Sequence, residues 1–234
     1  MKKLILFLIL ITGVYTAQGQ ILISLLLGDK LNSEGLEFGL EGGLNWSNIS
    51  GLDAKKSLRT FNLGFYFDIR IKNQWNFYTG VLVKSNLGVD KLSDNDLQFL
   101  KTTTNPEEGH YSQKINYFLV PALIKYHFKN RIYLEAGPQF GLMYKAWVEF
   151  NSDVDGREIR TRESNKDMIN RIDAGLMAGF GYKLKQKLGM SLGVKYYYGL
   201  TNVYKNESGT KNSSFFVKLT VPIGAGKKEQ PKPV

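Results

Sequence analysis

The chain has 234 residues, of which 43% are hydrophobic and 13% aromatic, and this is too apolar for an intrinsically disordered protein. Its formal charge of +10 is spread along the sequence without a recognisable nucleic-acid motif, so we expect no nucleic-acid partner. The absence of cysteine excludes disulfides and cysteine-based metal sites.

Residues 1–19 have the features of a secretory signal peptide. These are a Lys2-Lys3 start, an apolar stretch from Leu4 to Val14, and small residues at Ala17 and Gly19. An uncleaved membrane helix is the alternative, because Ile21 to Leu27 is apolar again. We assign residues 20–35 to an N-terminal periplasmic segment. No later stretch of 18 apolar residues occurs, so no further membrane helix is expected.

From Leu36 onward the sequence alternates apolar and polar residues with the period of a β-strand. We expect the first three strands at Leu36 to Trp46, Phe61 to Ile71 and Trp75 to Lys84. A fourth segment, about Lys114 to Phe128, alternates less regularly. Ile115, Tyr117 and Leu119 fit the apolar face before Pro121, and Ala122, Ile124, Tyr126 and Phe128 fit it afterwards. Because proline cannot donate to a β-ladder, we predict a β-bulge at Pro121.

Four more segments complete the alternation, at Ile132 to Glu149, Arg171 to Lys183, Leu188 to Tyr198 and Ser214 to Ile223. The connections alternate in length. Short turns are expected at Lys72-Asn73-Gln74, Lys129-Asn130 and Lys185-Gln186. Long loops are expected at about Ser47 to Thr60, Leu87 to Gln113, Asn151 to Met168, and Asn202 to Asn212.

This layout predicts an all-β fold, an eight-stranded antiparallel up-and-down transmembrane β-barrel with short periplasmic turns and long external loops. The barrel domain would cover residues 36–224, a polar tail residues 225–234, and both termini would lie in the periplasm. The alternative is a soluble barrel of lipocalin type, which would turn its apolar face inward.

The polar face of the strands carries glycines, amides and charges of both signs, which suit a narrow interior filled by paired side chains. We therefore expect a plugged lumen, with narrow conduction as the less favoured alternative. The predicted polar residues of the barrel interior are Glu37, Glu41, Asp68, Arg70, Glu135, Lys145, Arg171, Asp173 and Lys195. Lys84 falls on the same polar face.

The opposite face is almost purely apolar and aromatic, as expected of a surface that contacts outer-membrane lipid. Aromatic residues gather near both ends of the strands, and two such girdles are typical of membrane barrels. The predicted girdle residues are Trp46, Trp75, Phe77, Tyr126, Phe128, Tyr182, Tyr196 and Tyr198. Phe61, Tyr117, Phe150 and Phe215 are expected near the external rim as well.

Several short motifs resemble the outer-membrane β-barrel family common in Bacteroidetes, which includes the PorT-like proteins. They are Gly42-Gly43-Leu44-Asn45-Trp46-Ser47, Asn116-Tyr117-Phe118-Leu119-Val120-Pro121, Tyr133-Leu134-Glu135-Ala136-Gly137-Pro138-Gln139 and Gly199-Leu200-Thr201-Asn202. The likeness spans roughly Leu36 to Ile223. It implies the fold and an outer-membrane location. An accessory role in protein secretion or transport is implied by the resemblance alone.

Catalytic and metal-binding patterns are weak. His110 lies in a long loop and His127 near a short turn, and neither has a serine or aspartate partner by spacing, so we expect no catalytic residue. Residues Asn151 to Gly156 resemble the start of a calcium loop, but its twelfth position is Arg162, where a bidentate glutamate is needed. An ordinary turn is the better interpretation, and we expect no metal and no cofactor.

The leading hypothesis is a non-enzymatic structural or interaction barrel, which presents its external loops to a protein or ligand partner. The alternatives are a secretion or transport accessory, and a narrow pore or an outer-membrane enzyme. A lipase would need serine and histidine side by side at the outer rim, and a pore would need an open lumen past Glu135, Arg171 and Lys195.

Overall fold

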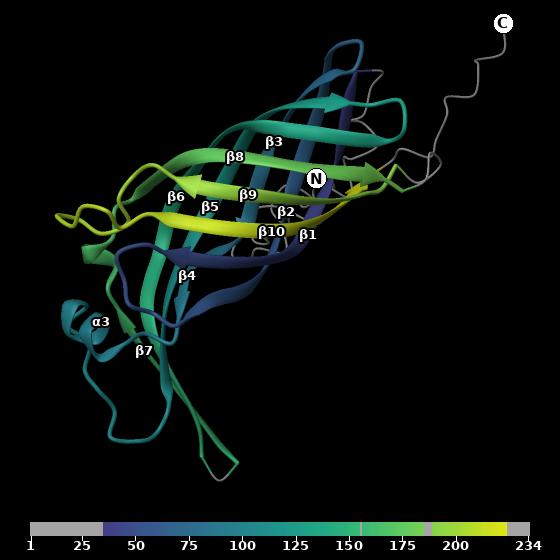
Figure 1. Ribbon diagram of the computed structural model, residues 1–234. Coiled ribbons are helices and arrows are strands. Elements are labelled where there is room, and N and C mark those ends of the chain that lie inside the picture. The colour runs from purple at the N-terminus through teal and green to yellow at the C-terminus, as the bar shows by residue number, and fades with distance from the viewer. Residues whose placement is uncertain (1–34, 155, 185–188, 224–234) are drawn as a thin grey trace, which may run out of the picture.

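The computed structural model describes residues 35–154, 156–184 and 189–223, and these fold into a closed ring of eight antiparallel strands (Figure 1). The proposed signal peptide, nearly all of the 20–35 segment, the Lys185-Gln186 turn and the 225–234 tail lie outside the described residues. Among the described residues, no helix is long and apolar enough to cross a membrane.

The eight predicted strands are all present, so the predicted fold class is confirmed. The ring consists of β1 (Leu36–Ile49), β2 (Lys56–Lys72), β3 (Trp75–Lys84), β5 (His110–His127), β6 (Ile132–Val154), β8 (Ile172–Lys183), β9 (Ser191–Gly199) and β10 (Asn212–Pro222). Each strand pairs with its neighbour in this order, and β1 closes the ring on β10, where Leu44 lies opposite Val217.

The two ends of the barrel differ in the length of their connections. At the turn end, short connections join β2 to β3 through Asn73 and Gln74 and β5 to β6 through residues 128–131. Asn73 and Arg131 take positive φ angles of 52° and 71° there, as tight turns require. β1 begins and β10 ends at this same end. The opposite end, the loop end, carries the long connections.

The long connections contain elements that alternation did not predict. The 87–113 region holds β4 (Asn86–Asp90), which pairs with β2 and β5, and the short helix α3 (Asp94–Phe99). Ser93 and Asp96 form a capping box at the start of α3. The 151–168 region holds β7 (Arg157–Ser164) and the 3-10 turn η2 (Lys166–Met168).

The predicted bulge at Pro121 is wrong. The β5–β6 register is the same at Pro121–Gln139 and at Ile124–Ala136, so no residue is inserted there. The β3–β5 ladder instead omits the pairs opposite Pro121, because proline has no N–H to donate. Ile115, Tyr117 and Leu119 consequently point into the barrel and are fully buried, and their predicted positions on the apolar outer face are wrong.

The bulges lie elsewhere. Between Asn116 and Tyr117 on β5, the partner on β6 changes from Lys145 to Met143, so Tyr144 is an extra residue. Between Leu63 and Gly64 on β2, the partner on β3 changes from Lys84 to Leu82, so Val83 is extra. A bulge reverses the faces of the residues that follow it. These two bulges stand near the loop end, and a further register shift, between Arg70 and Lys72 of β2, lies beside the short turn to β3.

The outer wall of the ring is apolar on every strand. Large apolar side chains that are exposed there include Phe61, Trp75, Val120, Phe140, Leu176, Leu192 and Phe215. The interior holds a polar cluster in the half near the turn end. The other half is an apolar core with Leu82, Leu87, Ile115, Tyr117 and Leu119, which Leu97 and Leu100 of the α3 region join. A soluble barrel with an apolar lining and a polar wall is therefore excluded.

Candidate functional site

The lumen near the turn end is filled by charged side chains in pairs. Lys195 Nζ lies 2.5 Å from Glu41 Oε1, and Lys125 Nζ lies 2.7 Å from Asp68 Oδ2. Lys218 Nζ lies 2.5 Å from Glu135 Oε1, close enough for an ion pair although the angles do not suit a hydrogen bond. These three carboxylates and three ammonium groups are all buried. Their charges balance, which lets them share a space with little water.

Tyrosine rings complete this packing. The Tyr78 hydroxyl donates a hydrogen bond to Glu41, and its ring lies 4.0 Å from Lys125 Nζ. Lys125 also lies 4.7 Å from the centre of the Tyr133 ring. Cations between aromatic faces are stabilised by the ring quadrupole. The described side chains therefore close the lumen at this level.

The predicted interior residues divide into two groups. Glu41, Asp68, Glu135, Asp173 and Lys195 are buried in the interior, and Glu37 is half-buried, where it accepts a 2.9 Å hydrogen bond from the Tyr66 hydroxyl. Lys145 is exposed on the outer face of β6, so its predicted interior position is wrong. Arg70 and Arg171 are exposed too, but Arg70 shares the inward face of β2 with the buried Asp68 and lines a cleft at the mouth of the lumen. The interior positions of Arg70 and Arg171 stay predictions. Arg70 lies at the turn end and Arg171 just before β8 at the loop end. Lys145 points outward because of the Tyr144 bulge.

The eight predicted girdle residues are all at least partly exposed. At the turn end, Trp75 and Tyr126 lie 4.8 Å apart between ring centres, and Phe128 lies 4.9 Å from Tyr126. At the loop end, Trp46 lies 6.1 Å from Phe215. Phe77 and Tyr182 belong to the first group, and Tyr196 and Tyr198 to the second. Tyr117 and Phe150 are buried, so their predicted rim positions are wrong.

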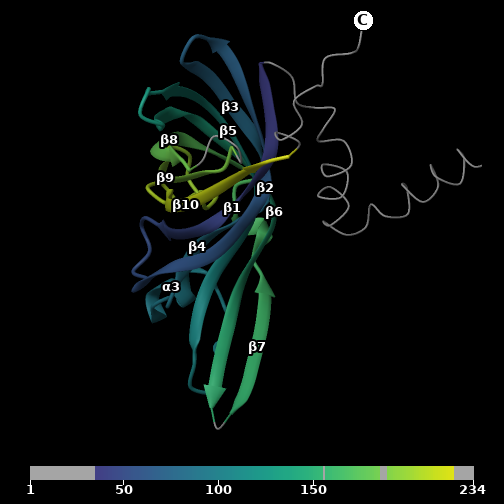
Figure 2. The same ribbon diagram turned by 90° about the vertical axis from the view of Figure 1, so that its right-hand side faces the viewer.

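The loop end carries a projecting sheet, which we call the extension (Figures 1 and 2). It consists of the first residues of β5, residues Trp147–Val154 of β6, and β7. A strand crosses a membrane in about 9–11 residues, whereas β6 has 23. β6 pairs with β8 only up to Leu142, and its last residues, from Trp147 on, pair with β5 and β7 and project beyond the ring. A tight turn at Gly156, with φ +73°, connects β6 to β7.

Glu149 is the centre of the outward face of the extension. It forms an ion pair with Lys114, accepts a 2.7 Å hydrogen bond from Arg162 Nε and accepts one of 3.2 Å from Trp147 Nε1. Burial alone would raise the pKa of this carboxyl, but the bonds from Lys114 and Arg162 outweigh burial and hold its pKa at about 2 instead of 4.5. Glu149 therefore joins all three strands of the extension as an anion.

This lowered pKa predicts how the extension responds to acid. A group whose folded pKa is depressed stabilises the fold above its unfolded pKa, and this contribution is lost as pH falls through the folded value. We expect the Trp147 indole N–H signal in NMR spectra of the folded protein to stay constant down to about pH 3 and to reach the midpoint of its change near pH 2, where Glu149 is half protonated. Glu149→Gln should make the signal insensitive to pH in this range. A midpoint near 4.5 in the unsubstituted protein would contradict the proposed ion pairs.

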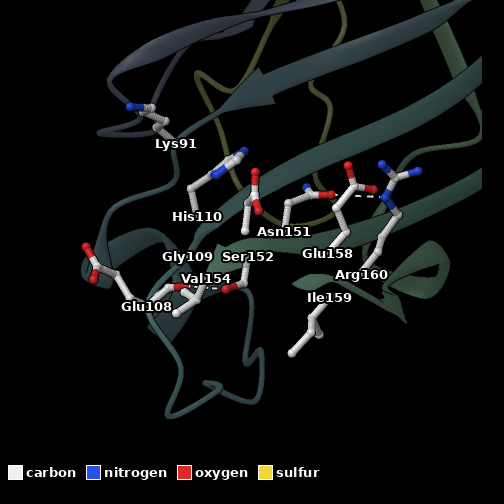
Figure 3. A pocket seen from close by; sticks show the side chains of 11 residues that line it. Lys91, Glu108, Gly109, His110, Asn151, Ser152, Val154, Glu158, Ile159 and Arg160 are labelled. Atoms are coloured by element: carbon white, nitrogen blue, oxygen red, sulfur yellow. Dashed lines mark hydrogen bonds between the residues drawn. The ribbon is translucent and has the colours of Figure 1, made fainter. Parts of the chain in front are cut away.

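A groove of about 680 Å³ lies further out on the extension (Figure 3). Lys91, His110, Asn151 and Arg160 line it together with the carboxylates of Glu108, Asp153 and Glu158. Arg160 Nε donates a 3.1 Å hydrogen bond to Asn151 Oδ1, which fixes both side chains on one wall. The lining offers both donors and acceptors and suits a polar ligand. Sequence reasoning assigned this stretch to an external loop and did not identify the groove.

The calcium-like residues do not form a loop. Asn151–Val154 belong to β6, where alternate side chains point to opposite faces, so their oxygens cannot converge on one ion. Arg162, at the twelfth position, pairs with Glu149. Among the described residues, no three metal-ligating side chains gather at one place.

The two histidines have different surroundings. His127 packs at the turn end, with its ring centre 5.8 Å from that of Tyr133. His110 Nε2 lies 3.7 Å from Asp90 Oδ1, which also accepts a 2.6 Å hydrogen bond from the Ser112 hydroxyl. In this chain of contacts the carboxylate stands between serine and histidine, whereas activation of a serine nucleophile needs the imidazole in the middle. The arrangement is that of a structural network.

A comparison with protein families agrees with the ring of strands. The model of the outer membrane protein beta-barrel domain family matches residues 18–205. No protein of curated function matches the sequence.

Among solved structures, the chain is similar to Ail, the attachment invasion locus protein of Yersinia pestis, at 12% identity and a TM-score of 0.44, covering 82% of this chain and 100% of Ail. It is also similar to Neisserial surface protein A, at 12% identity and a TM-score of 0.41, covering 80% and 99% of the two chains. A third similar structure is the outer membrane protein OprG from Pseudomonas aeruginosa, at 12% identity and a TM-score of 0.37, covering 80% of this chain and 93% of OprG.

The family model covers well over half of the sequence, so this protein belongs to the outer membrane protein beta-barrel domain family. It is an outer-membrane protein with an eight-stranded antiparallel barrel, and the structure adds the closing strand β10 beyond the matched residues.

Proposed function

We propose that this protein is a non-enzymatic scaffold, which holds the extension and the long connections outside the cell as a binding surface for a protein or ligand partner. The observation that carries the proposal is the contrast between the two halves of β6. Its first half closes a barrel filled by balanced ion pairs, and its second half holds a polar groove beyond the ring. Rigid scaffolds with functional surfaces at their loop ends are a common design.

The filled lumen favours this role over a narrow pore. A pore needs a continuous water path, but Lys195, Lys218 and Glu135 are buried against one another and against tyrosine rings. The order of Ser112, Asp90 and His110 gives no support to an enzyme. An accessory role in secretion or transport, which the PorT-like resemblance implies, stays a prediction without a structural observation behind it.

The orientation of the barrel is part of the proposal, with the turn end and both termini in the periplasm and the loop end outside. Because the sequence contains no cysteine, single cysteines can report it without a background. We expect Asp153→Cys, on the extension, to react in intact cells with a maleimide that cannot cross the membrane. Lys129→Cys, at an exposed turn, should react only after the cells are opened. Both residues are exposed, so accessibility alone does not separate them. The reverse pattern would overturn the proposed function.

A further inference from the structure

A row of cations follows the outer wall of the barrel at the loop end and continues onto the base of the extension. We call Arg59, Lys84, Lys114, Lys145 and Arg162 the rim belt. Three of these cations lie over outward-facing aromatic rings: Arg59 lies 5.7 Å from the Trp46 ring centre, Lys84 5.9 Å from Phe61, and Arg162 5.3 Å from Trp147. The carboxylate among them is Glu149, which Lys114 and Arg162 share. The belt therefore carries a surplus of positive charge.

The belt begins where the apolar wall ends. Arg59 is two residues beyond the exposed Phe61 on the same face of β2, and Lys145 is three residues beyond the exposed Leu142 on β6. Next to Lys145, the Tyr144 ring stacks on Phe118 at 4.6 Å between ring centres. An aromatic layer with cations directly beyond it is the arrangement that fits the boundary between acyl chains and charged head groups.

Two of these cations are aimed outward by the bulges. Lys84 follows the extra residue Val83 on β3, and Lys145 follows the extra residue Tyr144 on β6. Without the inserted residue, each lysine would continue the inward-facing phase of its strand, as Leu82 and Met143 do. Bulges serve to re-aim single side chains. The same device, used on two separate strands at one height, places two ammonium groups in the belt instead of in the lumen.

We propose that the rim belt binds the phosphate groups of the phosphorylated glycolipid in the outer leaflet. This inference rests on the proposed orientation, with the loop end outside. Lysine and arginine are the side chains that bind phosphate, and their attraction is strong near a head-group layer. A glycolipid with two phosphates on one sugar backbone presents several anions along the rim at once. The apolar wall below the belt receives its acyl chains.

The test is a titration of the folded full-length protein in detergent, with bound lipid counted by native mass spectrometry. The probes are bisphosphorylated lipid A, the same lipid without phosphates, phosphatidylglycerol, and inorganic phosphate as a competitor. We expect lipid A to bind at least about tenfold more tightly than the dephosphorylated lipid. Lys84→Gln with Lys145→Gln should weaken lipid A binding by about tenfold or more, because each basic residue near a head group contributes about fivefold.

Matched variants separate belt binding from general charge. Lys72→Gln with Lys129→Gln removes the same charge at exposed turn-end positions and should leave lipid A binding unchanged. Lys84→Arg with Lys145→Arg should retain it. The proposal is overturned if the turn-end pair weakens binding equally, if phosphatidylglycerol or the dephosphorylated lipid binds as tightly, or if equimolar inorganic phosphate displaces lipid A. Each variant is first checked for the faster migration of a folded barrel on an unheated gel. Cysteine labelling tests the orientation separately, so failure of either proposal is distinguishable.

Discussion

Glu41→Ala is expected to lower the free energy of unfolding by about 3–5 kcal/mol, because it leaves a buried ammonium group without its counter-ion. Lys195 is 1% exposed and lies 2.5 Å from Glu41, with Lys218 in the same cluster. The lumen offers Lys195 no bulk water as a replacement. Unfolding by urea of the protein in detergent, followed as the fraction that migrates as a folded barrel on an unheated gel, measures the loss.

Two further variants test the cause of this loss. Lys183→Ala removes an ion pair at the exposed turn end, where the charged atoms of Lys183 and Glu37 lie 3.7 Å apart, and it should cost less than about 1 kcal/mol. Glu41→Gln combined with Lys195→Met removes both charges and should recover much of the stability lost in Glu41→Ala. If Glu41→Ala unfolds at the same urea concentration as the unsubstituted protein, the charge balance of the lumen does not stabilise the barrel.

The ring itself could be predicted because a strand with one apolar and one polar face shows apolar residues at every second position of its sequence. On β8, for example, Ile172, Leu176 and Phe180 are exposed while Asp173 and Met177 are buried, as their alternation indicates. The short turns and long connections followed from the residues between the strands. The order of the strands in the ring then followed as well, since each strand of an up-and-down barrel pairs with the next along the chain.

The bulges could not be predicted, because alternation does not distinguish the lipid-facing wall from an apolar interior. Residues 132–148 of β6 alternate without interruption, yet Leu142 faces outward and Ala146 and Val148 face the core. The inserted Tyr144 changes the face without changing the pattern. Alternation alone therefore predicts that Lys145 points inward. On β5, the expectation of a polar lumen places Ile115 and Leu119 on the lipid side, whereas the structure buries both in the apolar half of the interior.

The extension could not be predicted from the sequence for a different reason. β7 reads Arg-Glu-Ile-Arg-Thr-Arg-Glu-Ser, which has no apolar face, so its pairing with β6 depends on contacts such as Glu149 with Arg162 and Asn151 with Arg160. Contacts of this kind become visible only when the register is known. For α3, the Ser93 and Asp96 spacing of a capping box was a signal in the sequence that alternation ignores.

Gly43→Ala is expected to destabilise the closed barrel by about 3 kcal/mol, at the upper end of the range for overpacking. A methyl group at Gly43 would overlap the carbonyl oxygen of Val217 and crowd the backbone of Lys218, on the strand that closes the ring. Because the overlap is with backbone, no side-chain rotation relieves it. Gly42→Ala is the matched control, since the nearest atom to its methyl group would be Leu63 Cδ1 at an ordinary 3.5 Å. The fraction that folds into lipid vesicles, measured by the migration of unheated samples, should fall for Gly43→Ala and stay high for Gly42→Ala. Equal folding of both variants would mean that β1 and β10 can separate enough to admit a side chain, and the tight closure argued from the register would then be wrong.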